Sequence, residues 1–166
     1  MTQRSIPHVL SRARRQCGAG LIEVLVSVIV LAIGLLGMAG LQASALRANQ
    51  SSYARSQAVM LSYFMLDMMR ADRGEALLGN YNTDTNAAPG AELDAICSAS
   101  DVPADTLIDN SRQDWLAALK TGLGDSPATC GAIRCDAAGE CTVQITWDDS
   151  RAGGLGQQRF ETRSRL

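Results

Sequence analysis

The feature that most constrains this chain is a long uncharged segment near the N-terminus. Residues 24–46 carry no charge, and the polar side chains among them are only Ser27, Gln42 and Ser44. As a helix at about 1.5 Å per residue, the segment would extend roughly 35 Å, which exceeds the hydrocarbon core of a bilayer, about 30 Å. A soluble domain would have to bury such a helix on all sides. The pattern therefore favours a membrane-spanning helix.

The charges on either side of this segment predict its orientation. The first 18 residues contain no acid and four arginines, Arg4, Arg12, Arg14 and Arg15. The whole chain has 15 basic and 17 acidic residues, so the part after the segment is acidic. A basic flank stays cytoplasmic, and we expect the acidic remainder to be exported. The acidic balance argues against a nucleic-acid binder. A minor alternative is DNA contact by four C-terminal arginines, Arg151, Arg159, Arg163 and Arg165.

Three common kinds of N-terminal segment do not account for the whole of this pattern. A lipoprotein signal has its apolar stretch before the cysteine, whereas Cys17 precedes the stretch here. A cleaved signal peptide has an apolar core of about 7–15 residues, shorter than this one, although Ala43, Ser44 and Ala45 could form a cleavage site. A plain signal anchor explains the span and the arginines, but it leaves the acid Glu23, just inside the apolar edge, unexplained.

A short motif explains that acid. Residues 18–23 read Gly18-Ala19-Gly20-Leu21-Ile22-Glu23, which resembles the processing site of type IV prepilins. In that family a basic leader ends at an obligatory Gly, and the fifth residue of the mature chain is Glu. The resemblance implies cleavage between Gly18 and Ala19 and N-methylation of Ala19. Ala19 and Gly20 stand where the family most often has Phe and Thr.

Residues 18–72 as a whole resemble minor pilins of the PilV type, most clearly over 33–42, 47–51, 55–58 and 67–71. Type II secretion pseudopilins share the processing site and are the nearest relatives outside that group. The resemblance implies an α+β, type IV pilin-like fold, with a long N-terminal helix packed on a small antiparallel sheet. It divides the chain into a basic leader (1–18), a transmembrane or fibre-core helix half (19–46), an amphipathic helix half (47–73) and a periplasmic head (74–166).

The family also implies a function. We expect a minor pilin that helps to initiate type IV pilus assembly after prepilin peptidase has processed it. Its expected place is the bacterial inner membrane, with a cytoplasmic N-terminus and a periplasmic head, and then the pilus fibre or its tip complex. Expected partners are prepilin peptidase, the other minor and major pilins and a tip adhesin, with no nucleic acid. The alternatives are a type II secretion minor pseudopilin and a signal-anchored periplasmic binding domain that never polymerises.

Glu23 is the candidate residue for assembly. A carboxylate in hydrocarbon costs about 2.5–3.5 kcal/mol at the centre of a helix, and in a fibre packed from such helices it would need a cation. The family assigns this acid to the amino group that cleavage creates at Ala19, in the same subunit or in a neighbour. A negative charge in the first helical turn also favours the helix dipole. The alternative is that Glu23 only reaches the membrane interface as part of a signal anchor.

Three glycines, Gly34, Gly37 and Gly40, lie inside the apolar segment. Glycine is about 1 kcal/mol less favourable than Ala in a helix interior, so the three predict either close approach of a second helix or a place where the helix loosens. Pilin helices often unwind in this region near a Pro, but residues 24–46 of this chain contain no Pro. We expect a glycine-based site of loosening instead, the alternative being lipid-facing glycines without a function.

The helix is expected to continue beyond the membrane, because residues 46–73 contain neither Pro nor Gly. Apolar or long side chains recur there at helical spacing, namely Tyr53, Gln57, Met60, Phe64 and Met68, with Leu61, Met65 and Met69 beside them. We expect this stripe, including its methionines, to pack in the core of the head. Gly74 and Gly79 are expected to mark the end of the helix.

The head is expected to combine a loop, a helix and a sheet. Residues 74–100 predict a surface loop, and a helix is expected to start at Asp101 with Pro103 in its first turn, or to restart at Ser111. Trp115 is expected to pack on the long helix. Alternating polarity predicts a strand over 141–148, a hairpin partner over 128–135 and a third strand over 157–164.

Cysteine usage supports export. Cleavage after Gly18 removes Cys17 and leaves an even number, Cys97, Cys130, Cys135 and Cys141, which suits an oxidising compartment. Of the three possible pairings, we favour Cys135 with Cys141 across a tight turn, and Cys97 with Cys130 tying the loop to the sheet. A zinc site is not expected, because no pair of cysteines has the C-x2-C spacing.

No catalytic, cofactor or metal site is predicted. The single histidine, His8, precedes the expected cleavage point. The chain has no nucleophile elbow, P-loop or dinucleotide fingerprint. The acids Asp148 and Asp149 fall at a predicted turn and are expected to be solvated. We therefore expect a structural protein and not an enzyme.

Overall fold

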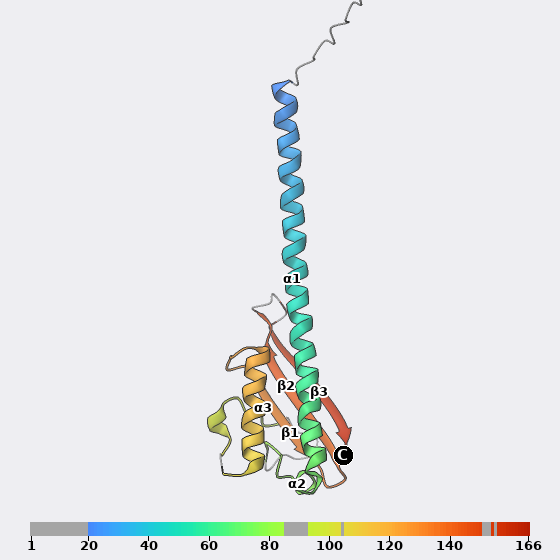
Figure 1. Cartoon of the computed structure of the whole chain (residues 1–166), viewed down its shortest axis with the longest axis vertical. Helices are drawn as coiled ribbons and strands as arrows, with labels where there is room; N and C mark the ends of the chain where they lie inside the picture. The colour runs from blue at the N-terminus through green and yellow to red at the C-terminus, as the bar shows by residue number, and fades with distance from the viewer. Residues whose placement is uncertain (1–19, 85–92, 104, 151–153, 155) are drawn as a thin grey trace, which may run out of the picture. The chain divides into compact units, whose positions relative to one another are not determined.

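The computed structural model describes residues 20–84, 93–103, 105–150, 154 and 156–166. In chain order its elements are helix α1 (Leu21–Ala71), short helix α2 (Arg73–Leu77), the 3₁₀ turn η1 (Ala99–Asp101), helix α3 (Leu107–Leu123), and strands β1 (Cys130–Cys135), β2 (Glu140–Asp148) and β3 (Gln157–Arg165) (Figure 1). The chain divides into two compact units, residues 1–42 and 43–166. The expected leader, 1–18, lies outside the described residues.

In the first unit the described residues form the N-terminal part of α1. The carbonyl oxygen of Gly20 accepts the backbone N–H of Glu23 at 2.9 Å and that of Val24 at 3.3 Å, and so begins the helix. The residues that follow include neither Pro nor a charge, so the helical ladder of backbone bonds continues without a break. A helix that satisfies all of its own backbone groups is one of the few structures that can cross hydrocarbon.

The second unit contains a three-stranded antiparallel sheet in the order β1–β2–β3. In the β1–β2 hairpin, Cys135 lies opposite Cys141. Its turn contains Gly139, whose φ of 84° lies in the left-handed region that glycine adopts without strain. β3 pairs with β2 along its whole length, from Gln157 to Arg165. The predicted meander is confirmed, with small shifts at the strand ends.

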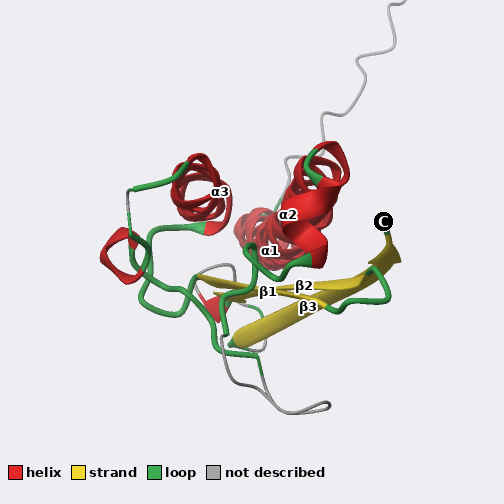
Figure 2. Cartoon of the chain, turned by 90° about the horizontal axis from the view of Figure 1, so that it is seen from below, coloured by secondary structure: helices red, strands yellow, loops and turns green. Residues whose placement is uncertain are grey.

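The core of the second unit lies between the sheet and helices on one of its faces (Figure 2). Val143, Ile145 and Trp147, at alternate positions of β2, are buried under these helices. The indole of Trp115 on α3 is fully buried, and its Nε1–H donates to the backbone oxygen of Leu61 on α1 at 3.0 Å. Because a sheet this small cannot bury its apolar face alone, α1 and α3 are required to cover it. The expected α+β layout is confirmed.

The apolar stripe expected on α1 is only partly correct. Met65 and Met69 are buried and Leu61 and Met68 pack against the core, but three other expected members are exposed: Tyr53 by 62%, Met60 by 56% and Phe64 by 49%. The face that enters the core is instead Ala58, Ser62, Met65, Leu66 and Met69. Its spacing is equally helical. Two of its members are small residues, which allow close approach of other elements but which a count of large apolar residues overlooks.

The start predicted for the second helix is wrong. η1 ends at Asp101, whose carboxylate accepts the backbone N–H of Ser98 at 2.8 Å and so closes a separate capped turn. Helix α3 begins at Leu107, and its N-cap is Thr106, whose Oγ1 accepts the N–H of Asp109 at 3.1 Å. Ser111 does not cap a helix. Its hydroxyl donates to the carbonyl oxygen of Leu107, one turn earlier, at 2.9 Å.

The long helix also ends slightly earlier than expected. α1 stops at Ala71, and Asp72 precedes the short helix α2, which contains Gly74. The loop that follows is held by an ion pair between the buried carboxylate of Asp84 and Arg134 on β1. The loop predicted over 74–100 therefore begins with a helical turn and is anchored on the sheet.

Two disulfides join the elements of the second unit. They pair Cys97 with Cys130 and Cys135 with Cys141, which is the pairing favoured from the sequence. The first closes a loop with a sequence separation of 33 residues and the second a loop of 6. The longer loop constrains the unfolded chain more.

Removing the two disulfides is expected to have unequal effects. Replacing Cys97 and Cys130 together by Ala should lower the free energy of unfolding by about 4 kcal/mol, whereas the same change at Cys135 and Cys141 should lower it by about 2 kcal/mol, on the loop-entropy estimate. Urea unfolding of the two double variants, followed by circular dichroism in detergent micelles, measures both values. Equal losses, or a larger loss for the shorter loop, would contradict the estimate.

Candidate functional site

The candidate site is the first turn of α1 together with the apolar helix that follows. Glu23 lies in that first turn, and its carbonyl oxygen accepts the hydroxyl of Ser27 at 2.7 Å. Its side chain is exposed and makes no ion pair with any residue that the structure describes. Glu23 is therefore a carboxylate at the start of an uncharged segment, with no cation paired to it among the described residues.

The apolar helix presents its side chains to the surroundings over its whole circumference. All residues from 20 to 50 are exposed, for example Leu21 by 84% and Leu36 by 73%. The helix is long and apolar enough to cross a membrane. Gly34, Gly37 and Gly40 lie within continuous helix, and an ideal Cβ at any of them would have no neighbour within 4 Å. The expected cleavage and methylation positions, Gly18 and Ala19, lie outside the described residues.

A second apolar surface lies on α1 within the second unit and was missed in the sequence analysis. The exposed side chains Tyr53, Met60 and Phe64 recur at helical spacing, with Tyr63 beside them at 53% exposure. We call these four residues the aromatic face. The spacing was visible in the sequence, but nothing in it distinguished this face from the buried one.

A groove of about 690 Å³ lies next to this face, between α1, the end of α3 and the end of β2. Leu46, Tyr53, Leu123 and Trp147 are among its lining residues. Trp147 is only 3% exposed, and its indole N–H has no partner among the described residues. Within the second unit, the groove therefore lies between Leu46, the last residue of the uncharged segment, and the C-terminal end of β2.

The acid Asp149 does not behave as predicted. It was expected to be solvated, but it is only 4% exposed. Its Oδ2 accepts the hydroxyl of Ser51 on α1 at 2.5 Å, and the backbone of Gly154 is so close that an ideal Cβ there would be 2.1 Å from Oδ2. Asp149 therefore ties the end of β2 to α1, a structural role that a turn-like sequence pattern does not reveal.

Another buried acid, Asp109, also has a structural role. The Thr106 hydroxyl donates to its carboxylate at 2.7 Å, and Arg112 forms an ion pair with it. These two contacts hold the pKa of Asp109 below its usual value, against the opposing effect of burial. They stabilise the first turn of α3. Among the described residues no group of three or more His, Cys, Asp or Glu side chains could hold a metal ion.

The first turn of α1 also lies in the part of the chain that is similar to a known family. Residues 13–39 match the prokaryotic N-terminal methylation motif. The match includes the motif at 18–23 and the first part of α1, and it supports a prepilin-type protein that is similar to type IV pilins. No curated protein and no solved structure matches the chain.

This match and the fold support the same general kind of protein. The methylation motif and the single long apolar helix near the N-terminus indicate a membrane-anchored protein of the pilin or pseudopilin type. Proteins with this motif are structural and not enzymatic. Their general partners are prepilin peptidase and the other components of the pilus or pseudopilus.

Proposed function

We propose that this protein is a minor pilin that helps to initiate assembly of a type IV pilus. The observation that carries the proposal is the coincidence of the methylation motif at 13–39 with Glu23 in the first turn of α1, directly before the exposed, uncharged segment 24–46. The proposal places the precursor in the inner membrane, with the basic leader cytoplasmic and the head periplasmic. The PilV-type resemblance of residues 18–72 supports a minor pilin over other members of the family.

In the proposed mechanism, prepilin peptidase cuts between Gly18 and Ala19 and the new amino group is methylated. Glu23 then pairs with the Ala19 amino group of an adjoining subunit as the helix moves from lipid into the fibre. A carboxylate at membrane depth is costly without a cation, so this pairing favours one axial position of the helix in the bundle. The aromatic face would extend helix contact beyond the membrane segment, because it is apolar and uncovered.

Mass spectrometry of the N-terminus of protein purified from membranes tests this proposal. We expect the mature chain to start at Ala19 and to carry a methyl group on its amino nitrogen. A chain that starts at Leu46 would mean signal-peptidase cleavage after Ala45, and an intact Met1 would mean a plain signal anchor. Either result would overturn the proposal.

The main alternative is a type II secretion minor pseudopilin, because the methylation motif is common to both groups. The two differ in the machine that the subunit joins. Deleting the gene and scoring surface pili and secreted enzymes separates them. Loss of piliation with normal secretion supports the minor pilin, and the reverse supports the pseudopilin.

We also propose that Gly34, Gly37 and Gly40 allow α1 to loosen in the fibre. Replacing all three by Ala should favour helix by about 1 kcal/mol per position, and it introduces no clash within the described chain. We expect the triple variant to be processed normally but to enter filaments several-fold less well, as measured by immunoblotting of sheared pili. A fibre map in which this protein is helical throughout residues 34–40 would contradict the proposal.

A further inference from the structure

The two edges of the sheet differ in how their backbone groups are bonded. On the β1 edge, the N–H and C=O groups of Gly131, Ile133 and Cys135 turn away from β2. Each of these six groups has a hydrogen bond of 2.7–3.2 Å to the segment that precedes α3. The residues that make these bonds are Ile96, Thr83 and Asn82. The β1 edge is therefore fully covered.

No described strand pairs with the outer edge of β3, which we call the open edge. The N–H of Asp149 donates to Gly156 O at 3.0 Å, and the N–H of Leu166 donates to Gly139 O at 2.9 Å. Bonded pairs alternate along an antiparallel ladder, so the even-numbered residues of β3 bond to β2 and the odd-numbered ones turn their backbone groups outward. In the part of the chain that the structure describes, the backbone groups of Glu161 and Arg163 have no partner on that side.

β3 also lacks most features that protect an edge from pairing. It has 9 residues, pairs with β2 without a bulge and contains neither Pro nor Gly. Natural edge strands are usually shortened, bulged, interrupted by Pro, covered or charged. Charge is the only one of these devices that β3 uses, and its charge is mainly of one sign.

The odd-numbered residues of β3, whose backbone groups face the open edge, carry three guanidinium groups and one carboxylate. Glu161 lies between two of the arginines, with Arg159 at 3.1 Å and Arg163 at 2.9 Å. The side chain of Arg163 is nevertheless 65% exposed and that of Arg159 48%. Glu161 is thus already shared between two arginines, and within β3 itself the basic side chains outnumber the acidic ones.

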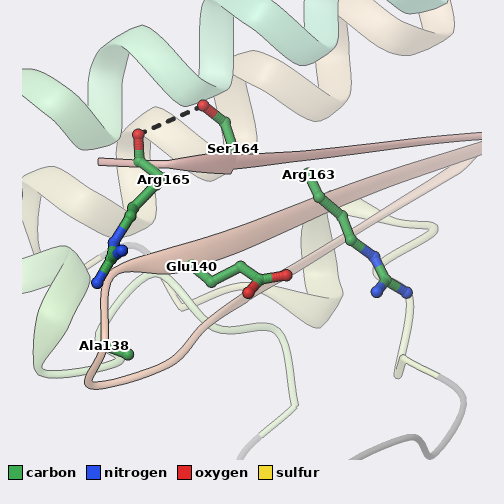
Figure 3. Close-up of a pocket in the computed structure, with 5 residues that line it drawn as sticks. All are labelled: Ala138, Glu140, Arg163, Ser164 and Arg165. Atoms are coloured by element: carbon green, nitrogen blue, oxygen red, sulfur yellow. Dashed lines mark hydrogen bonds between the residues drawn. The ribbon is translucent and has the colours of Figure 1, made fainter.

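The C-terminal end of β3 borders a hollow of about 290 Å³ (Figure 3). Arg163 and Arg165 extend on either side of Glu140, which belongs to the neighbouring strand β2. Two guanidinium groups against one carboxylate leave room and positive charge for an acidic side chain from outside.

We propose that the open edge of β3 binds an extended segment of a partner protein that adds a fourth strand and carries acidic side chains at alternate positions. Backbone hydrogen bonds would supply the binding, and the arginines would select acidic partners and their register. A second copy of this chain fits less well. Full antiparallel overlap of two β3 strands, centred on Glu161, places Arg159 opposite Arg163 and Glu161 opposite itself, and like charges in opposite positions are destabilising.

The proposal does not depend on the pilin assignment, because its test uses purified protein. The probes are two fluorescent peptides as long as β3, one in which Glu alternates with Thr and one in which Lys alternates with Thr. Binding to the full chain in detergent micelles is measured by fluorescence anisotropy at low salt. We expect the Glu peptide to bind at least about tenfold more tightly than the Lys peptide. Reversing Arg159, Arg163 and Arg165 to Glu should invert this preference.

A matched pair of variants distinguishes strand addition from simple charge attraction. Glu161→Gln removes the acid and keeps the backbone N–H, so binding of the Glu peptide should become tighter. Glu161→Pro removes the same acid together with the outward N–H, at an edge position where Pro costs no bond to β2, so binding should be lost. Circular dichroism verifies that both variants are folded, and the charge reversal remains a test if Glu161→Pro is not.

Three outcomes would overturn the proposal. If the two peptides bind equally well, or if neither of them binds, the edge does not select acidic strands. Undiminished binding to folded Glu161→Pro would mean that the arginines attract acids without strand pairing. Self-association of the full chain that Glu161→Pro abolishes would mean that the occupant is a second copy.

Discussion

Replacing Glu23 with Ala is expected to reduce incorporation of this protein into filaments at least about tenfold, while its insertion into the membrane is unchanged. The reason is the charge pairing proposed for Glu23, which lies just before the uncharged segment of α1 and has no ion-pair partner among the described residues. In a bundle of such helices the Ala19 amino group of a neighbour would lose its counter-charge. An unpaired buried charge typically costs about 3–5 kcal/mol, which is more than a tenfold effect.

The two readouts of this experiment are expected to separate, because incorporation should fall while membrane insertion does not. Removing a carboxylate makes insertion of the helix into lipid more favourable, so a loss of incorporation cannot arise from failed insertion. The measurements are the amount of protein in sheared filaments and in the membrane fraction, by quantitative immunoblotting. Glu23→Gln, which keeps the size of the side chain, should fail as Glu23→Ala does.

Asp114→Ala is a matched control, since it removes one exposed negative charge from the head. It should be incorporated like the natural protein. If Glu23→Ala were incorporated as well as Asp114→Ala, the charge-pairing role would be wrong. Glu23 would then only reach the membrane interface, as in a signal anchor.

The second large effect is expected at Gly131 on β1, where replacement by Ala should lower the free energy of unfolding by about 3 kcal/mol or more. An ideal Cβ at this position would lie 2.4 Å from Cη2 and Cζ3 of Trp115 and 3.0 Å from Cδ1 of Leu119. The indole ring cannot easily move, because it is fully buried and its N–H is bonded to Leu61 O. Strand β1 and helix α3 would therefore have to separate.

Urea unfolding followed by far-ultraviolet circular dichroism, in detergent micelles, measures this loss. Gly74→Ala on α2 is the matched control, since an ideal Cβ there meets nothing within 4 Å, and it should leave stability unchanged or raise it slightly. Adding Trp115→Phe to Gly131→Ala should recover part of the loss, because the smaller ring relieves the contact, and the two changes should therefore be strongly non-additive. A loss at Gly131 no larger than that at Gly74 would show that the packing described here is incorrect.

Parts of the fold could be predicted because their signals are local. Alternating polarity is enough to identify β2, and the Asp136–Glu140 turn identifies β1 as its neighbour. The two cysteine pairs follow from that hairpin. The helix start at Thr106 was missed, because Asp101 and Pro103 form an equally plausible helix start, whereas in the structure Asp101 closes the capping box of the separate turn η1. A local pattern does not say which of two competing caps the packing will select.

The candidate site, too, was only partly predictable from the sequence. The motif at 18–23 and the acid in the first helical turn are contiguous in the chain, so the sequence alone was sufficient to identify them. The aromatic face was assigned to the core because Tyr53, Met60 and Phe64 have the same spacing as a buried stripe. Whether a helix face is buried depends on what packs against it, and here the small residues Ala58 and Ser62 are the ones turned inward.

The sequence by itself determined the apolar helix, the acid near its start and the antiparallel meander, since each depends on neighbouring residues or on a short periodic pattern. Only the tertiary structure decided which face of α1 enters the core, why Gly131 must lack a side chain, and that β1 is covered while β3 is open. These features arise where segments far apart in the chain meet. The register and distance between such segments depend on the packing of the whole head, which no local pattern encodes.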